Sequence, residues 1–270
     1  MAEYCLLLTE TENESAKVLS FLMSSLGLLE KEAKLRLKAA PGFLLENAGF
    51  EPAMAARALA AAAGLKTMVV ENRPLPQPLV IEKIEFKNDG FYYQNKTQKD
   101  FARYDSLTML AAAAIEVFLP PKITAAELET DLLEEVRLKY FPSILKPENV
   151  RPKDPVPHPQ KEIVYYADIF SAQNDLPHPA SALGGCGLRL RFRHDEFDFS
   201  GLGASKTYSS TENFRLLLDE LEARAFSKPL MNRAFSGIKK KTPARDFILT
   251  GLEAYEKELL WLSCIKNRNQ

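Results

Sequence analysis

Hydrophobic and polar positions in the first seventy residues alternate between strand-like runs and helical spacing. Three segments are short apolar runs typical of buried strands, and three have helical periodicity or propensity. The predicted strands cover residues 4–9, 43–46 and 66–71, and the predicted helices cover residues 16–26, 30–40 and 53–63. The pattern therefore predicts a β-α-α-β-α-β unit, which we assign to a first domain of residues 1–73.

Two proline-rich segments divide the rest of the chain. Pro74, Pro76 and Pro78 alternate, which favours a stiff and extended linker. Residues 146–160 hold five prolines and predict a second linker or loop. These linkers predict a second domain of residues 79–141, an antiparallel sheet with a helix, and a third of residues 161–270, an antiparallel sheet with two helices. The expected fold class is α+β.

Local signals place elements within these two domains. The sequence Asn88-Asp89-Gly90 between residues 80–86 and 91–93 predicts a β-hairpin. Further predicted strands are residues 162–170, 188–192 and 196–199, and predicted helices are residues 124–140, a segment capped by Ser210 or Thr211, and residues 245–261. Residues 107–118 could be a strand or a helix. The modules are similar in pattern to pleckstrin-homology-like barrels; alternatively, both stretches supply strands to one larger α+β domain.

A series of landmarks in the first domain indicates a family resemblance. These landmarks are Gly27-Leu28, Lys31-Glu32-Ala33-Lys34, Ala39-Ala40-Pro41, Ala63-Gly64 and Val69-Val70. Their order and spacing over residues 3–72, about a quarter of the chain, resemble the C-terminal domain of the bacterial ribosomal stalk protein. The same fold serves the substrate adaptor of the Clp protease. The resemblance implies a small protein-docking module.

The first predicted helix departs from that family. The stalk protein recruits translation factors through basic residues, whereas the aligned positions here are Ser15, Ser20 and Met23, beside Ala16 and Leu19. Losing these charges removes the electrostatic steering that speeds association, so we do not expect a ribosomal protein. We expect Leu19 and Met23, with Ala16 and Ser20, to bind a protein partner; alternatively, Leu19 and Met23 belong to the core.

Composition and charge restrict the function classes. The chain of 270 residues has 35 basic and 36 acidic side chains, so no global field attracts nucleic acid or anionic membranes. No apolar run reaches the length of a membrane span, and the N-terminus does not have the pattern of a secretory signal. Three widely spaced cysteines, Cys5, Cys186 and Cys264, favour reduced thiols and a cytoplasmic location.

Few residues carry a pattern that predicts catalysis or cofactor binding. The glycine-rich residues 184–187 precede a strand instead of a helix, so we expect no phosphate-binding loop and no cofactor. His158, His178 and His194 have no zinc-ligand spacing, so no metal site is predicted. An enzyme with a site near Cys186 and His194, together with Asp168, remains an alternative.

A last alternative is a phosphate- or nucleic-acid-binding module. Arg189, Arg191 and Arg193 alternate along a predicted strand, and Lys240 lies in a basic run before the last helix. Acidic neighbours, including Asp195, instead favour a solvated, ion-paired face, and we do not expect nucleic acid. The sequence as a whole therefore predicts a non-enzymatic interaction, scaffold or adaptor protein.

Overall fold

The structure, a computed structural model, describes residues 2–10, 15–119, 160–172 and 187–268. Its fold class is α+β, which confirms the prediction from the sequence. The chain divides into two compact units, one of residues 1–116 with 164–270 and the other of residues 117–163. The helices of the described chain all belong to the first unit.

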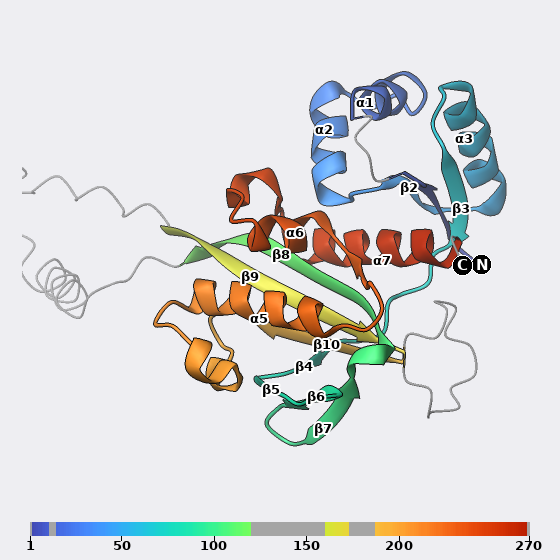
Figure 1. The fold of residues 1–270 in the computed structure, drawn as a ribbon. Coiled ribbons are helices and arrows are strands. Elements are labelled where there is room, and N and C mark those ends of the chain that lie inside the picture. Colours follow the sequence, from blue (N-terminus) through green and yellow to red (C-terminus); the bar gives the residue numbers. More distant parts are fainter. Residues whose placement is uncertain (1, 11–14, 120–159, 173–186, 269–270) are drawn as a thin grey trace, which may run out of the picture. The chain divides into compact units, whose positions relative to one another are not determined.

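Residues 4–71, which belong to the first unit and are called the N-terminal domain below, pack three helices on one face of a small sheet (Figure 1). Its elements are β1 (Tyr4–Leu8), α1 (Ser15–Ser24), α2 (Glu30–Ala39), β2 (Phe43–Ala48), α3 (Phe50–Ala62) and β3 (Thr67–Glu71). The sheet order is β2-β1-β3, with both neighbours antiparallel to β1. Leu6 of β1 joins a core with Phe21 and Leu22 of α1. The element order is the one that the hydrophobic pattern predicts.

The opposite face of this sheet is covered by the C-terminal helix α7 (Leu252–Arg268). Because side chains alternate along a strand, Cys5 and Leu7 point away from Leu6 and pack with Trp261 in a second core cluster. The indole Nε1 of Trp261 donates a hydrogen bond to the carbonyl oxygen of Leu8, with 2.7 Å between the two atoms. The N-terminal sheet is therefore buried on both faces.

A larger sheet joins strands from both sides of the second proline-rich segment. Its order is β11-β8-β9-β10-β4, and β12 also pairs with β8. The strands are β4 (Leu79–Val80), β8 (Leu107–Leu119), β9 (Gln160–Ser171), β10 (Leu188–Arg193), β11 (Leu230–Met231) and β12 (Ile248–Leu249). Strands from both stretches therefore lie in one sheet, as the alternative of a shared α+β arrangement expects.

The alanine-rich residues 107–118, which the sequence left open, lie in a strand. The side chains from Leu110 to Ala114 are all buried, so both faces of β8 are covered. A central strand buried on both faces shows a continuous apolar run without alternation. Periodicity alone therefore could not distinguish this strand from a helix.

The predicted hairpin is confirmed within a second small sheet, which has the order β5-β6-β7. Its strands are β5 (Lys83–Phe86), β6 (Gly90–Gln94) and β7 (Lys99–Arg103), and the 3₁₀ turn η1 (Tyr104–Ser106) leads from β7 into β8. The strand predicted at residues 196–199 is wrong. Asp198 makes one isolated bridge to Lys83, and its carboxylate then accepts the backbone N–H of Ser200, which starts the 3₁₀ helix η3 (Phe199–Ser205).

Helices complete the first unit. The apolar stripe centred on Phe214 forms α5 (Ser210–Arg224), which is capped by Ser209 instead of Ser210 or Thr211. The sequence did not predict α6 (Arg233–Lys239), and α7 begins later than expected because η4 (Ala244–Asp246) and β12 precede it. The predicted helix at residues 124–140 and the domain boundary at residue 141 lie outside the described residues. Among the described helices, none is long and apolar enough to cross a membrane.

Candidate functional site

The expected partner-binding residues of α1 differ in exposure. Ala16 and Ser20 are exposed, and Met23 has 39% of its surface exposed. Leu19 is half-buried and packs against the core beside Leu6 and Phe21. The core interpretation therefore applies in part to Leu19, whereas Met23 lies on the surface.

The alternating arginines of β10 surround a buried carboxylate. Asp168 of β9 lies directly opposite Arg191 in the register and is 1% exposed. Its carboxylate accepts hydrogen bonds from Nε of Arg189 and from Nε of Arg191, both at 2.7 Å. Glu256 of α7 accepts hydrogen bonds from both arginines as well. Arg189 also donates to the carbonyl oxygen of Pro76, which holds the first linker against the sheet.

The expectation of a solvated arginine face is wrong for Arg189 and Arg191, because α7 covers both guanidinium groups. Their donors are directed at carboxylates, which leaves little access for a phosphate. Arg193 lies nearer the surface and pairs with Asp195 at 2.6 Å. Lys240 is exposed at the end of α6, and among the described residues no hydrogen bond or ion pair joins it to the three arginines.

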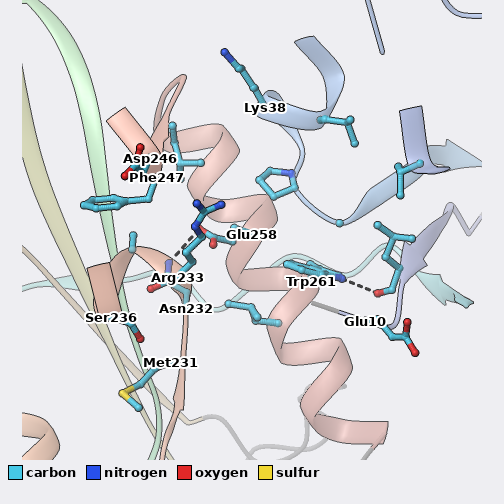
Figure 2. A pocket seen from close by; sticks show the side chains of 18 of the residues that line it. Glu10, Lys38, Met231, Asn232, Arg233, Ser236, Asp246, Phe247, Glu258 and Trp261 are labelled. Atoms are coloured by element: carbon cyan, nitrogen blue, oxygen red, sulfur yellow. Dashed lines mark hydrogen bonds between the residues drawn. The ribbon is translucent and has the colours of Figure 1, made fainter. Parts of the chain in front are cut away.

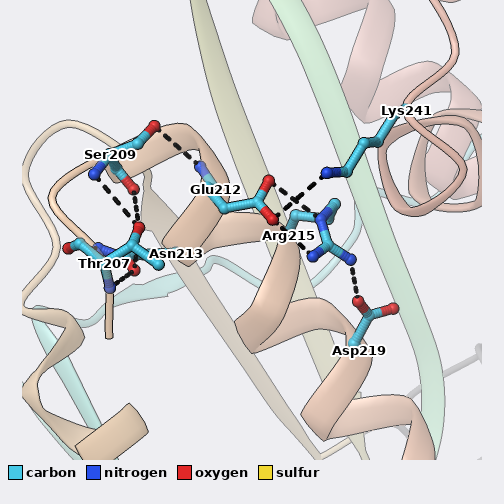
Figure 3. Close-up of polar contacts among 7 residues, drawn as sticks. All are labelled: Thr207, Ser209, Glu212, Asn213, Arg215, Asp219 and Lys241. Carbon is cyan, nitrogen blue, oxygen red and sulfur yellow. Dashed lines mark hydrogen bonds and ion pairs between the residues drawn. The ribbon is translucent and has the colours of Figure 1, made fainter. Parts of the chain in front are cut away.

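The basic run before the last helix is largely neutralised by α5. Lys239 forms ion pairs with Asp219 and Glu222, and Lys241 lies 3.5 Å from Glu212. Figure 3 shows Glu212 between Lys241 and Arg215, next to the cap of α5. The acidic helix therefore offsets these lysines.

The cap of α5 is organised by a buried asparagine. The Oδ1 of Asn213 accepts a hydrogen bond from the backbone N–H of Thr207 at 2.6 Å, and its Nδ2 donates one to the carbonyl oxygen of Thr207 at 2.8 Å (Figure 3). Ser209 then accepts the N–H of Glu212 as the helix cap. These contacts hold the loop before α5 against the first turn of that helix.

The alternative enzyme site cannot be assembled from the described residues. Cys186, His158 and His178 lie outside them. The His194 side chain is buried, and its Nδ1 accepts the backbone N–H of Tyr165 at 3.1 Å. Asp168 is held by two arginines. Within the described ranges, no group of three or more His, Cys, Asp or Glu side chains is placed to hold a metal ion.

A cavity of about 830 Å³ lies where the N-terminal domain meets the C-terminal elements (Figure 2). One wall comes from β1, α1, α2, the turn at Pro41 and Gly42, and the residues just before β3. The other comes from β11, α6, η4, β12 and α7. Polar side chains on this wall include Asn232, Arg233, Asp246 and Glu258. The volume lies in the range of small-molecule sites.

Asn232 connects three elements beside this cavity. Its Oδ1 accepts the backbone N–H of Ala112 at 3.0 Å, and its Nδ2 donates to the carbonyl oxygen of Ala112 at 2.7 Å. The same Oδ1 caps α6 by accepting the N–H of Phe235. Because β11 and β12 pair with β8 on either side of Ala112, the amide replaces a missing backbone partner on that strand.

Glu258 of α7 is the third residue that forms a hydrogen bond with the side chain of this asparagine. Its Oε2 accepts Nδ2 of Asn232 at 3.1 Å, and the residue is 9% exposed. Burial raises the pKa of Glu258 to about 7, although the Asn232 hydrogen bond and the charge of Arg233 lower it. The carboxyl group therefore carries a proton for part of the time at neutral pH.

Sequence reasoning missed this cavity and its polar groups. A signal was present, because Glu258 falls three residues after Tyr255 and four before Leu262, inside the apolar stripe of the last helix. Asn232 likewise has the residue type that favours a helix N-cap. No protein family, curated protein or solved structure in the comparisons matches this chain.

Proposed function

We propose that this chain is a non-enzymatic protein-protein interaction or adaptor protein that binds a protein partner through α1. The observation that carries the proposal is the surface position of Met23. Ala16, Ser20 and Met23 follow at intervals of four and three residues, so they form one stripe along the helix. The resemblance of residues 3–72 to the ribosomal stalk domain supports a docking role.

The other faces of the N-terminal domain support the choice of α1. Trp261 and its neighbours on α7 cover the open face of the sheet, so that face is not available to a partner. Leu19 packs into the core and anchors the helix from below. The stripe itself is small and uncharged, so we propose a partner with a shallow apolar groove and an association that depends weakly on salt.

A cytoplasmic location belongs to the same proposal. Cys5 and Cys264 are both free thiols, although they belong to the same core cluster between β1 and α7. Free thiols fit a reducing compartment.

Photo-crosslinking in the cells that make the protein tests the docking surface. A benzoylphenylalanine at position 20 would report the partner, and the same group at position 59, on the exposed side of α3, is the control. We expect a cross-linked species from position 20 that disappears when Met23→Lys is added. Because Met23 lies on the surface, Met23→Lys should change the free energy of unfolding by less than about 1 kcal/mol.

Two results would contradict the proposal. Cross-linking of the same species from positions 20 and 59 would show no preference for α1. Persistence of the species in a folded Met23→Lys variant would show that the stripe is not the contact. Leu19→Lys is not a suitable probe by itself, because a charge at this half-buried position is expected to destabilise the domain.

A further inference from the structure

Two cationic side chains at the cavity form no salt bridge with another described residue, although the charge of Arg233 acts on Glu258. Arg233 starts α6 and lines the wall beside Asn232, and Lys38 lines the N-terminal side near the end of α2 (Figure 2). By contrast, Lys66 of the same lining pairs with Glu10. Both Arg233 and Lys38 are solvent-exposed, so an incoming anion can reach them.

Glu258 presents a second polar group to this space. Its Oε2 is held by Asn232, and its Oε1 has no hydrogen-bond partner among the described residues. The carboxyl group is fixed by the buried contacts of Asn232, so its orientation does not depend on a ligand. When protonated, such a carboxyl group can donate one hydrogen bond to an anion.

The rest of the lining is mainly apolar. Trp261 and Phe247 contribute aromatic rings, and Leu37, Ile248 and Leu262 contribute aliphatic side chains. A cavity with apolar walls and a few placed polar groups suits a ligand with an apolar body and one polar end.

We propose that this cavity binds a small organic carboxylate, with the acid group against Arg233 and the apolar body against Trp261 and Phe247. Arg233 and the protonated Glu258 together donate hydrogen bonds to the acid group, and Lys38 adds long-range attraction. A dianionic phosphate is disfavoured, because it brings a second negative charge next to Glu258. An organic amine is disfavoured by Arg233.

This arrangement couples binding to a proton. Two carboxyl groups in contact share one proton, so the bound state keeps Glu258 protonated. The charged or titratable groups around Glu258 are Arg233 on α6, Asp246 on η4, Tyr255 on α7, and Glu10, Lys38 and Lys66 on the N-terminal side. Glu258 titrates near neutrality, so the affinity should fall by about tenfold per pH unit above pH 7.

Calorimetric titration of the full-length chain with octanoate tests the proposal. We expect octanoate to bind at pH 6, with octylamine and octyl phosphate bound at least tenfold more weakly. Arg233→Ala should weaken octanoate binding by tenfold or more, because a charge-assisted hydrogen bond is lost. Glu258→Gln keeps a donor at every pH, so it should bind octanoate without the pH dependence. Lys240→Ala removes an exposed charge just after α6 and should leave binding unchanged.

Three results would overturn the proposal. The first is no heat or thermal shift with octanoate at pH 6. The second is equal binding of octylamine. The third is octanoate binding that Arg233→Ala and Lys240→Ala affect equally. Each result is readable in a folded protein, because both side chains are exposed. The proposal does not depend on docking through α1.

Discussion

Replacement of Glu258 by glutamine isolates the effect of a buried carboxyl group on stability. The glutamine carbonyl oxygen can still accept the hydrogen bond that Nδ2 of Asn232 donates. The substitution also preserves the size and shape of the side chain. What it removes is the ionisation of a group that is 9% exposed.

The magnitude follows from the pKa. The pKa of Glu258 rises from an ordinary value of 4.5 to about 7. The folded protein therefore holds the proton more tightly than the unfolded chain does, and stability falls as the pH rises from 4.5 to 7. With about 1.4 kcal/mol for each pH unit, the loss reaches about 3 kcal/mol above pH 7. The free energy of unfolding of Glu258→Gln should therefore exceed that of the wild type by about 3 kcal/mol at pH 8. At pH 4.5 the two values should be nearly equal.

Urea unfolding of both proteins at pH 4.5, 6, 7 and 8 measures this difference. The matched control is Glu256→Gln, two residues away on α7. Burial alone would raise the pKa of Glu256, but the hydrogen bonds and charges of Arg189 and Arg191 lower it. Its ionised form therefore stabilises the fold above its unfolded pKa, and Glu256→Gln should be destabilising at pH 8. Parallel pH profiles for the wild type and Glu258→Gln would refute the reasoning.

Two further substitutions test contacts that hold the elements together. Asn232→Ala leaves the buried N–H and C=O of Ala112 unpaired and removes the cap of α6. The free energy of unfolding in urea should therefore fall by about 3 kcal/mol or more. A fall of less than about 1 kcal/mol would contradict this role. Gly42 has a φ of +81°, and a methyl group added there would overlap the indole ring of Trp261. Gly64 has a similar φ of +75°, but no atom lies within 4 Å of an added methyl group, so Gly64→Ala is the control. We expect Gly42→Ala to lower the melting temperature far more than Gly64→Ala, and equal losses would show that backbone strain alone is responsible.

Local patterns predicted those parts of the fold that depend on near neighbours. The stripe of Phe214 and Leu217 repeats at helical spacing, and Asn88-Asp89-Gly90 has the composition of a tight turn. Their structures follow from side chains a few residues apart, so spacing was sufficient. The prediction of a strand at residues 196–199 is wrong because the Asp198 carboxylate accepts a hydrogen bond from the backbone N–H of Ser200 and starts a turn. Such competition between a side chain and the backbone is not visible in the alternation of apolar residues.

Burial of the arginine strand depended on a distant element. Alternation along residues 188–192 correctly placed Arg189 and Arg191 on one face of the strand and Leu190 and Phe192 on the other. Besides Asp168 on the neighbouring strand, those arginines pair with Glu256, more than sixty residues later. An alternating strand is equally consistent with a solvated face unless a distant element such as α7 covers it. The two-residue strands β11 and β12 were too short for any periodic signal.

The candidate site illustrates the same limit. A glutamate inside an apolar helical stripe was visible in the sequence, but its partner Asn232 is the N-cap of a different helix, α6, and part of the wall that faces it comes from α2. Such a site is formed by tertiary contacts, so its residues share no sequence motif. A charged residue within a predicted apolar stripe is the signal that could have directed attention to it.

The cavity and the docking surface use different sides of α1, because the buried Val18 lines the cavity whereas Ala16, Ser20 and Met23 are exposed. Trp261 lines the cavity and also bonds the carbonyl oxygen of Leu8 on β1, so it belongs to the contact between α7 and the N-terminal sheet. A ligand that fills the cavity touches both sides of that contact. Because a ligand stabilises the state that binds it, occupancy would favour the packed arrangement over any opened one. The exposed stripe of α1 lies on the side of the helix away from Val18, so it would remain accessible to a partner in the packed arrangement.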